Sequence, residues 1–465
     1  MKKINIMTFF IMIVCLIILS FSVLRLDVLP DKYLIIYFVL ISILSIIFGL
    51  ITFINKNKII RYIITFIIIL ISILSCFISF IVLDKANDFL ENIEEVEEVS
   101  IYYLIGLKES NYIDIVDLKD KSIGISSNGT DYNAIKLLND KIKYNVVKYD
   151  NLFDLYDDLL NNKLDCIYID SNIKMLFDEV VNDFSDKTMI ISELNIKSSM
   201  ESNDEEINNF KDSINIYISG IDTYGSIDKV SRSDVNIIMS INQKKKKILL
   251  TTIPRDTYVK LHGTNGPKDK LTHAGIYGIN MSLTTLEDFL GIDIDYYVRV
   301  NFDTLISTID AIGGVDVYSD VSFKVGKYNF NEGYNHMNGK QALAFSRERK
   351  QFSEGDNLRG KHQQAVITGI VEKVTSSKTL LSNYTNILSS LSNSFQSNID
   401  DSIIRSFVKE QLNSMSSWDV KSISIEGNGS YTRSTYSMPG WNLYVMIPDE
   451  ETVINVRNEI NDLNS

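Results

Sequence analysis

Two carboxylates and one guanidinium form the first group of side chains that could do chemistry. Asp222 follows an alternating apolar run at 214–219, and Arg232 and Asp234 precede a second run at 235–241. These runs predict two β-strands, so the three side chains lie at the mouth of their connection. This set suits a divalent cation beside a phosphate, because hard cations take oxygen ligands and arginine grips phosphate oxygens in a fork. A surface ion pair on a solvated turn accounts for the pattern equally well.

Another arginine stands at the end of a further predicted strand. The apolar run at 248–253 is followed by Pro254, which ends a β-ladder, and then by Arg255 and Asp256. Open α/β sheets place their ligands beyond the ends of strands, so Arg255 is a candidate anion-binding residue. Asp256 either pairs with Arg255 and orients it, or caps the next turn.

The remaining candidates lie between residues 346 and 364. Arg347 and Arg349 are two residues apart, so in an extended segment they face the same way and repel each other unless an anion lies between them. Asp356 then opens a predicted helix, and Arg359 and Gln363 share its face. A helix N-terminus beside an arginine is suited to phosphate. A salt-bridge network with nearby acidic residues is the alternative.

These residues require a layered α/β domain to position them. The segment from 209 to the C-terminus predicts strands at 214–219, 235–241, 248–253, 296–300 and 315–318. Helices are expected at 281–290 and 302–312, each closed by glycine, and a long helix after Asp356. The lysine run at 244–247 fits a solvated hairpin tip.

Composition narrows the class of protein. A chain of 465 residues is long enough for two or three domains, and its net charge of -13 argues against duplex nucleic acid as a partner. Its 3 cysteines provide neither a disulfide framework in the polar part nor a zinc motif.

Three apolar stretches, at 4–23, 33–54 and 63–83, are each long enough to cross a bilayer. Basic residues precede the first stretch and crowd the loop between the second and third, which places both on the cytoplasmic side. The chain after residue 83 is then outside the cell, in a multi-pass plasma-membrane protein. No charged residue lies deep in a span, so residues 1–83 form an anchor rather than a transport path.

Two further segments separate the anchor from the last domain. Residues 84–99 are acidic with helical apolar spacing and predict a stalk helix. Residues 100–201 alternate strands and helices, which predicts a small accessory α/β domain with a mostly parallel sheet. This domain resembles one lobe of an extracellular solute-binding protein. Its helix N-terminus at Gly129 and Thr130 could attract an anion, although a spacer or docking module fits as well.

An ordered set of motifs between residues 220 and 364 resembles the LytR-CpsA-Psr family of bacterial envelope enzymes. The motifs are Gly-Ile-Asp, Ser-Arg-Ser-Asp, Ile-Pro-Arg-Asp, Lys-Leu-Thr-His-Ala, Ile-Gly-Gly-Val-Asp-Val, Ser-Arg-Glu-Arg and Gly-Asp-x-x-Arg-x-x-x-Gln-Gln. Three spans and an extra domain resemble the capsule-associated members. The resemblance implies an α-β-α layered catalytic domain at 209–465 with a mixed central sheet. It also implies transfer of a glycopolymer from polyprenyl pyrophosphate to peptidoglycan, usually onto the 6-hydroxyl of N-acetylmuramic acid.

The resemblance also implies roles for individual residues. Asp222 and Asp234 match the pair that binds Mg²⁺. The residues that match the pyrophosphate clamp are Arg232, Arg255, Arg347, Arg349 and Arg359, with Lys270 also facing the phosphates. Asp356 and Gln363 match further active-site positions, and Asp356 is a candidate for accepting the proton of the acceptor hydroxyl. One departure is His362, because members often carry arginine there; Lys361 could substitute.

Three functions therefore remain open. The first is a membrane-anchored, Mg²⁺-dependent phosphotransferase for a teichoic acid or capsular glycan. The second is a non-catalytic envelope sensor that binds the carrier lipid. The third is a pyrophosphatase that releases the glycan to water.

Overall fold

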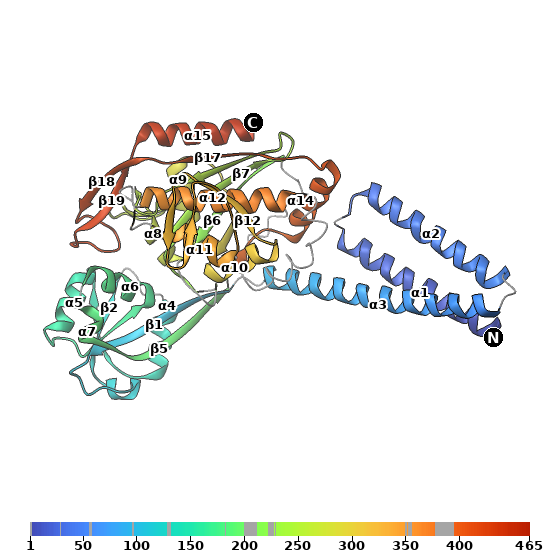
Figure 1. The fold of residues 1–465 in the computed structure, drawn as a ribbon. Coiled ribbons are helices and arrows are strands. Elements are labelled where there is room, and N and C mark those ends of the chain that lie inside the picture. The colour runs from blue at the N-terminus through green and yellow to red at the C-terminus, as the bar shows by residue number, and fades with distance from the viewer. Residues whose placement is uncertain are drawn as a thin grey trace.

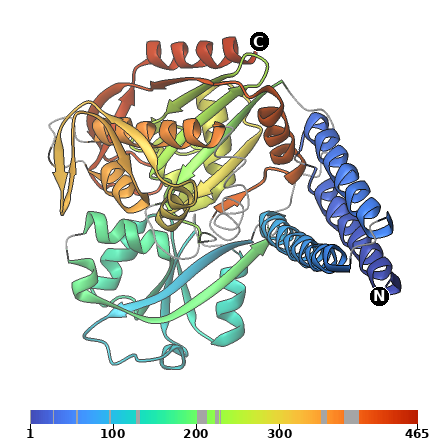
Figure 2. The ribbon, with the colours of Figure 1, turned by 45° about the vertical axis from the view of Figure 1, so that its right-hand side comes forward.

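The protein is described from a computed structural model that covers residues 2–27, 29–54, 58–94, 97–127, 132–181, 183–199, 212–221, 227, 229–348, 351, 356–376 and 395–465. Figure 1 shows three apolar helices projecting to one side of two α/β domains. Figure 2 shows the smaller domain, which follows the helices in the chain, beneath the larger C-terminal one.

The helices α1 (Lys2–Leu26), α2 (Asp31–Ile54) and α3 (Lys58–Glu94) pack along one another. Each contains a segment long and apolar enough to span a membrane, at Ile6–Arg25, Asp31–Ile54 and Tyr62–Phe80, as the sequence predicted. Helix α3 continues past its apolar segment to Glu94, and strand β1 starts at Glu97. The predicted stalk helix at 84–99 therefore ends early, because its last residues begin a strand.

The accessory domain is a five-stranded sheet in the order β3-β2-β4-β1-β5. Strands β2, β3 and β4 are parallel, but β1 pairs antiparallel with both β4 and β5, so the expected mostly parallel sheet is in fact mixed. The strands are β1 (Glu97–Leu107), β2 (Ser122–Ser126), β3 (Asn145–Tyr149), β4 (Cys166–Asp170) and β5 (Thr188–Ser199). Its helices are η1 (Ile115–Leu118), α4 (Tyr132–Lys141), α5 (Leu152–Leu160), α6 (Ser171–Val180) and α7 (Phe184–Lys187).

The C-terminal domain is organised around a mixed six-stranded sheet in the order β16-β11-β6-β7-β8-β17. Strands β6, β8, β11 and β17 point one way, while β7 and β16 run antiparallel to their neighbours. The strands are β6 (Ser213–Gly220), β7 (Val235–Asn242), β8 (Lys247–Thr252), β11 (Tyr296–Val300), β16 (Phe395–Ser397) and β17 (Asp419–Ser424). This mixed sheet confirms the predicted class.

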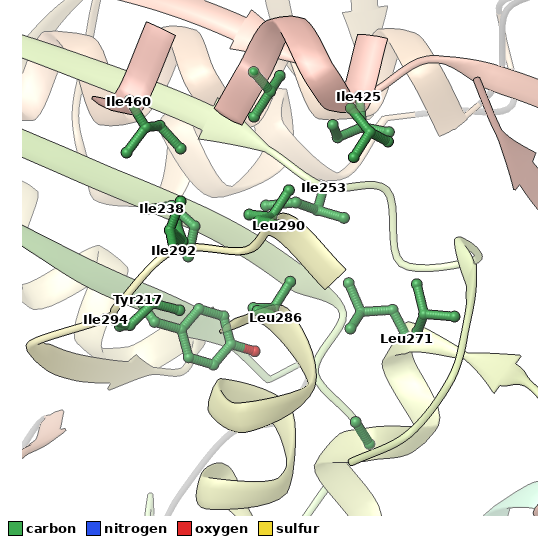
Figure 3. Packing of buried hydrophobic residues seen from close by; sticks show 14 of the residues in the cluster. Tyr217, Ile238, Ile253, Leu271, Leu286, Leu290, Ile292, Ile294, Ile425 and Ile460 are labelled. Atoms are coloured by element: carbon green, nitrogen blue, oxygen red, sulfur yellow. The ribbon is translucent and has the colours of Figure 1, made fainter. Parts of the chain in front are cut away.

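Alternation along the strands gives each face of this sheet its own core. Tyr217 and Ile238 point to the face covered by α9 (Ile279–Leu290) and α15 (Glu450–Asn464), where Figure 3 shows them near Leu286 and Leu290. The intervening isoleucines of β6 and β7 pack on the other face, against α12 (Asp356–Thr375) and α14 (Asp401–Ser414). The domain is therefore an α-β-α sandwich.

Smaller elements surround this sandwich. Helices α10 (Phe302–Ala311) and α11 (Gly339–Arg347) form a side core with β12 (Val315–Ser319), β13 (Phe323–Val325), β14 (Tyr328–Phe330) and β15 (Gly333–Met337). The remaining elements are β9 (Tyr258–Val259), β10 (Asp269–Lys270), α8 (Leu271–Ala274), η2 (Gly275–Tyr277), β18 (Gly427–Thr432) and β19 (Leu443–Pro448).

Helix α14 also contacts the connection between the first two apolar helices. The Lys409 ammonium lies 2.8 Å from the Asp27 carboxylate, and Arg405 donates to the carbonyl oxygen of Arg25 at 3.0 Å. From the anchor side, Lys32 donates to the carbonyl oxygen of Asn413 at 2.5 Å. The connection between α1 and α2 and the C-terminal domain are therefore at the same end of the helical bundle.

Candidate functional site

The candidate site lies at one edge of the six-stranded sheet, where the four parallel strands end and β7 begins. Asp234 immediately precedes β7, and its backbone N–H donates to the carbonyl oxygen of Gly220, the last residue of β6, at 2.8 Å. Arg255 follows β8 after the Pro254 turn. Two loops that are distant in sequence are thus brought together by neighbouring strands.

Asp234 and Arg255 form an ion pair that is largely removed from water. Arg255 Nη1 donates to Asp234 Oδ1 at 2.8 Å, and the Thr272 hydroxyl donates to the same oxygen at 3.2 Å. Burial alone would raise the pKa of Asp234, but the charges of Arg255, Arg232 and Arg359 outweigh it and hold that pKa below its ordinary value. The site therefore presents a firmly ionised carboxylate among three guanidinium groups.

A second ion pair supports Arg255 from the other side. Lys270 Nζ lies 2.5 Å from Asp256 Oδ1, and Arg255 Nε lies 3.7 Å from Asp256 Oδ2. Lys270 and Asp256 are each less than a tenth exposed. Arg255 is thus held between two carboxylates. Of the two roles that the sequence left open for Asp256, the geometry favours orientation of Arg255.

The backbone of α8 and η2 sets the distance between these loops. Thr272 N–H donates to the carbonyl oxygen of Arg255 at 2.9 Å, and Ser233 N–H donates to the carbonyl oxygen of Thr272 at 3.3 Å. Gly275 lies against the same loop: a Cβ there would be 2.6 Å from the Ser231 carbonyl oxygen and the Ser233 nitrogen. This position needs glycine because the two backbones approach so closely.

Helix α12 contributes Arg359, whose charge acts on Asp234, and one turn later Gln363, which is half-buried. Asp356 is the first residue of α12. Its side chain lies outside the described part of the structure, as do Asp222 and Arg349.

The placement of Arg347 corrects one expectation. It is the last residue of α11, so it is not part of an extended segment. The helix starts after Asn338, whose side chain forms a capping box with Gln341, and it continues to Arg347. Arg347 therefore does not belong to the extended segment in which it was predicted to face the same way as Arg349. The Arg347 guanidinium lies 4.2 Å from the ring centroid of Phe302, which begins α10 after β11. Arg347 thus stands near the same edge of the sheet.

His362 belongs to the core rather than to the clamp. Its ring stacks on Phe323 with centroids 5.0 Å apart and lies 4.2 Å from Phe345. Burial lowers its pKa to about 4, against a partly opposing hydrogen bond to the Phe345 backbone. His362 is therefore neutral at physiological pH, and Lys361 beside it is exposed.

The donor set is compatible with a magnesium ion. Mg²⁺ is usually bound through one or two carboxylates together with substrate phosphates, so an ionised Asp234 fits this chemistry. Within the described residues, no three His, Cys, Asp or Glu side chains cluster as a complete metal site. The second predicted ligand, Asp222, falls outside them.

Two supporting features escaped the sequence analysis. The Thr272 hydroxyl contacts Asp234, and a buried hydrogen-bonded network joins Tyr217, Ser219 and Ser233 beneath the loop. Serine and threonine are too common for their spacing to reveal such contacts. The alternation of β6 does, however, place Tyr217 and Ser219 on one face.

Comparison with known proteins gives a consistent assignment. The model of the LytR_cpsA_psr family matches residues 183–451. A Bacillus anthracis relative, "Polyisoprenyl-teichoic acid--peptidoglycan teichoic acid transferase TagU", is 37% identical over 187 residues, 40% of this chain and 60% of the relative. An Oceanobacillus iheyensis protein of the same name is 33% identical over 248 residues, 52% of this chain and 73% of the relative. The match thus spans about 60% of the length of the first of these relatives.

Solved structures are also similar. Bacillus subtilis TagV has 28% identity and a TM-score of 0.46, covering 55% of this chain and 98% of TagV. A structure described as "TagT bound to LI-WTA" has 26% identity and a TM-score of 0.45, covering 57% of this chain and 98% of that one. Because the family model matches more than half of the sequence, this protein is a member of the LytR_cpsA_psr family.

Proposed function

We propose that this protein is a membrane-anchored phosphotransferase that moves a glycopolymer of the teichoic acid class from polyprenyl pyrophosphate to peptidoglycan. The observation that carries the proposal is the cluster of Asp234 with Arg255, Arg232 and Arg359 at the edge of the sheet. Three guanidinium groups around one carboxylate suit a ligand with several phosphate charges. The names of the relatives support the polymer class and the acceptor.

In the proposed reaction, the acceptor hydroxyl oxygen attacks the phosphorus atom that bears the glycan. A new P–O bond forms, the bond to the bridging oxygen breaks, and polyprenyl phosphate leaves with that electron pair. The hydroxyl proton passes to a base, for which Asp356 at the start of α12 is our candidate. The reaction yields a phosphodiester between glycan and peptidoglycan.

Such a reaction needs charge neutralisation more than covalent catalysis. Arg232, Arg255 and Arg359 would bind the pyrophosphate, with Arg347 and Arg349 completing the clamp and Gln363 beside it. Lys270 would act through Asp256, which orients Arg255. Mg²⁺ held by Asp234 and Asp222 would supply Lewis-acid stabilisation of the leaving phosphate.

The proposed orientation places the two soluble domains outside the cytoplasm. Lysines precede α1, and basic residues crowd the loop between α2 and α3, which assigns both to the cytoplasmic side. The contact between Asp27 and Lys409 agrees with three crossings, because it places α14 on the same side as the connection between α1 and α2; the basic residues decide which side that is.

The test uses the full-length protein in detergent with a short-chain polyprenyl-pyrophosphate glycan, Mg²⁺ and peptidoglycan. Wild type should attach glycan to the polymer, and Arg255→Ala should reduce the rate by about 10²–10³, the usual cost of losing one positioned donor. Arg433→Ala, an exposed arginine in the same domain, is the matched control. Chelation of divalent cations should stop transfer and added Mg²⁺ should restore it. Free glycan would instead identify a pyrophosphatase, and donor binding without turnover would identify a sensor.

A further inference from the structure

The hydrophobic core of the accessory domain is completed by side chains of the catalytic domain. Trp441 lies between β18 and β19, and its ring centroid is 5.2 Å from that of Phe153 and 5.9 Å from that of Phe177. It is 9% exposed and shares a core cluster with Met438, Ile276 and the buried residues of α5 and α6. The two domains thus meet through a packed apolar interface.

The segment that carries Trp441 is tied to one loop of the candidate site. Ser437 N–H donates to the Asp269 carboxylate at 2.6 Å, and the hydroxyls of Ser437 and Tyr277 lie 3.1 Å apart. Asp269 is fully buried, pairs with His273 at 2.7 Å and directly precedes Lys270. Lys270 in turn contacts Asp256, which orients Arg255. A continuous chain of contacts therefore leads from Trp441 to the clamp.

The accessory domain reaches the other loop of the site by a separate route. The carbonyl oxygen of Val99, near the start of β1, accepts a hydrogen bond from Val230 N–H at 3.2 Å, and Val99 forms a parallel bridge with Lys229. Arg232 and Asp234 follow within four residues. The accessory domain thus contacts the loop that precedes Asp234 directly, and it reaches Arg255 through Trp441 and the Asp269–Lys270 segment.

We infer that the position of the accessory domain affects ligand binding at the candidate site. Trp441 is the positioning residue that transmits this effect to the Asp269–Lys270 loop. This inference deepens the proposed function and rests on it. A ligand bound by both Asp234 and Arg255 favours one placement of the accessory domain. Because coupling between two sites is reciprocal, holding the domain in that placement strengthens binding of the ligand by the same factor.

The first test is tryptophan fluorescence, because the chain has only 2 tryptophans, Trp418 and Trp441. Trp418 donates its indole N–H to Gln411 of α14 and packs on the opposite side of the catalytic domain from α9 and α15. In the full-length Trp418→Phe protein, Trp441 is the sole reporter. Farnesyl pyrophosphate is the probe, and its binding is measured independently by calorimetry. We expect a saturable change in Trp441 emission that follows binding and disappears in the Arg255→Ala background.

The second test is kinetic. Trp441→Ala should lower kcat/KM for the lipid-linked donor at least tenfold at a temperature where the variant is folded, with an increase in KM for the donor. Trp441→Phe, which keeps an aromatic ring against Phe153 and Phe177, should recover most of the activity. A variant that only unfolds more easily would keep the kcat and KM of wild type per folded molecule, and that result would overturn the inference.

The outcomes separate this inference from the proposed function. Binding of the probe with constant Trp441 emission refutes the coupling, even where glycan transfer is robust. A Trp441 signal that follows probe binding, in a protein that transfers no glycan, supports the coupling and refutes the transferase. The fluorescence measurement leaves Trp441 intact, so it remains decisive if Trp441→Ala does not fold.

Discussion

Acidification should destabilise the protein through His362, and replacing this residue should remove that sensitivity. His362 is 3% exposed, and its ring packs against those of Phe323 and Phe345, which also contact each other. Burial lowers its pKa from the ordinary 6.5 to about 4 in the folded protein. Between these values the unfolded chain binds a proton that the folded protein excludes. The stability contribution is therefore present above pH 6.5 and is lost as the pH falls toward 4.

The size of the effect follows from linkage. For one group with pKa values of 6.5 unfolded and about 4 folded, lowering the pH from 7 to 5 lowers the free energy of unfolding by about 2 kcal/mol. With about 2–4 °C of Tm per kcal/mol for a domain of this size, wild type should lose roughly 4–8 °C from this residue alone. His362→Phe keeps a planar ring in the stack and cannot titrate.

The assay is thermal unfolding of full-length wild type and His362→Phe in the same detergent at pH 7, 6 and 5. The difference between their Tm values should change by roughly 4–8 °C across this range. Phe345→Leu is the control, because it weakens the same stack without removing a titrating group and should leave the pH dependence of wild type. Equal pH dependence in wild type and His362→Phe would refute the assignment of His362 as a buried neutral residue.

Three further predictions concern the site and the anchor. Gly275→Ala should lower the rate of glycan transfer and cost about 1–3 kcal/mol of stability, because its Cβ would be 2.6 Å from the Ser231 carbonyl oxygen. The control is Gly360→Ala, which should keep the wild-type transfer rate because its Cβ meets only a Thr252 methyl group at 3.7 Å. Phe302→Leu should reduce the rate of glycan transfer less than tenfold, because it removes a cation–π contact worth about 0.5–1 kcal/mol from Arg347 but keeps the arginine charge. A loss of rate as large as that caused by Arg347→Ala would contradict this prediction. A membrane-impermeant maleimide should label Tyr431→Cys on intact cells but Ile59→Cys only after permeabilisation. These exposed residues lie on opposite sides of the membrane in the proposed orientation. The reverse labelling pattern would show that the orientation is the opposite of the proposed one.

The elements predictable from sequence are those with a local signal. The strand predicted at 296–300 has these bounds in the structure, and the helix predicted at 281–290 begins only two residues earlier. The strand is specified by its run of apolar residues, and the helix by its apolar period and the glycine that closes it. The start of β1 could not be found in this way, because Glu97–Val99 are acidic or follow acidic residues and are ordered by pairing with residues about 100 positions away.

The same distinction holds within the site. Arg255 and Asp234 were both predicted as site residues because each adjoins a strand, but the ion pair between them depends on how the strands associate. The contact of Lys270 with Asp256 joins two irregular segments and carries no periodic signal. Arg347 is a different case: Asn338 and Gln341 form a capping box that does mark the start of α11 in the sequence.

The uninterrupted length of α3 limits how far from the membrane the proposed transferase can act. Its 37 residues extend about 55 Å, of which the apolar segment at 62–80 accounts for only about half. Residues 81–94 extend this helix by roughly 20 Å beyond the apolar segment, while α14 lies beside the connection between α1 and α2. The candidate site therefore lies within about one domain's height of the bilayer. For the proposed transfer, the accepting peptidoglycan must therefore lie within about one domain's height of the bilayer, and peptidoglycan farther out is beyond the reach of the site.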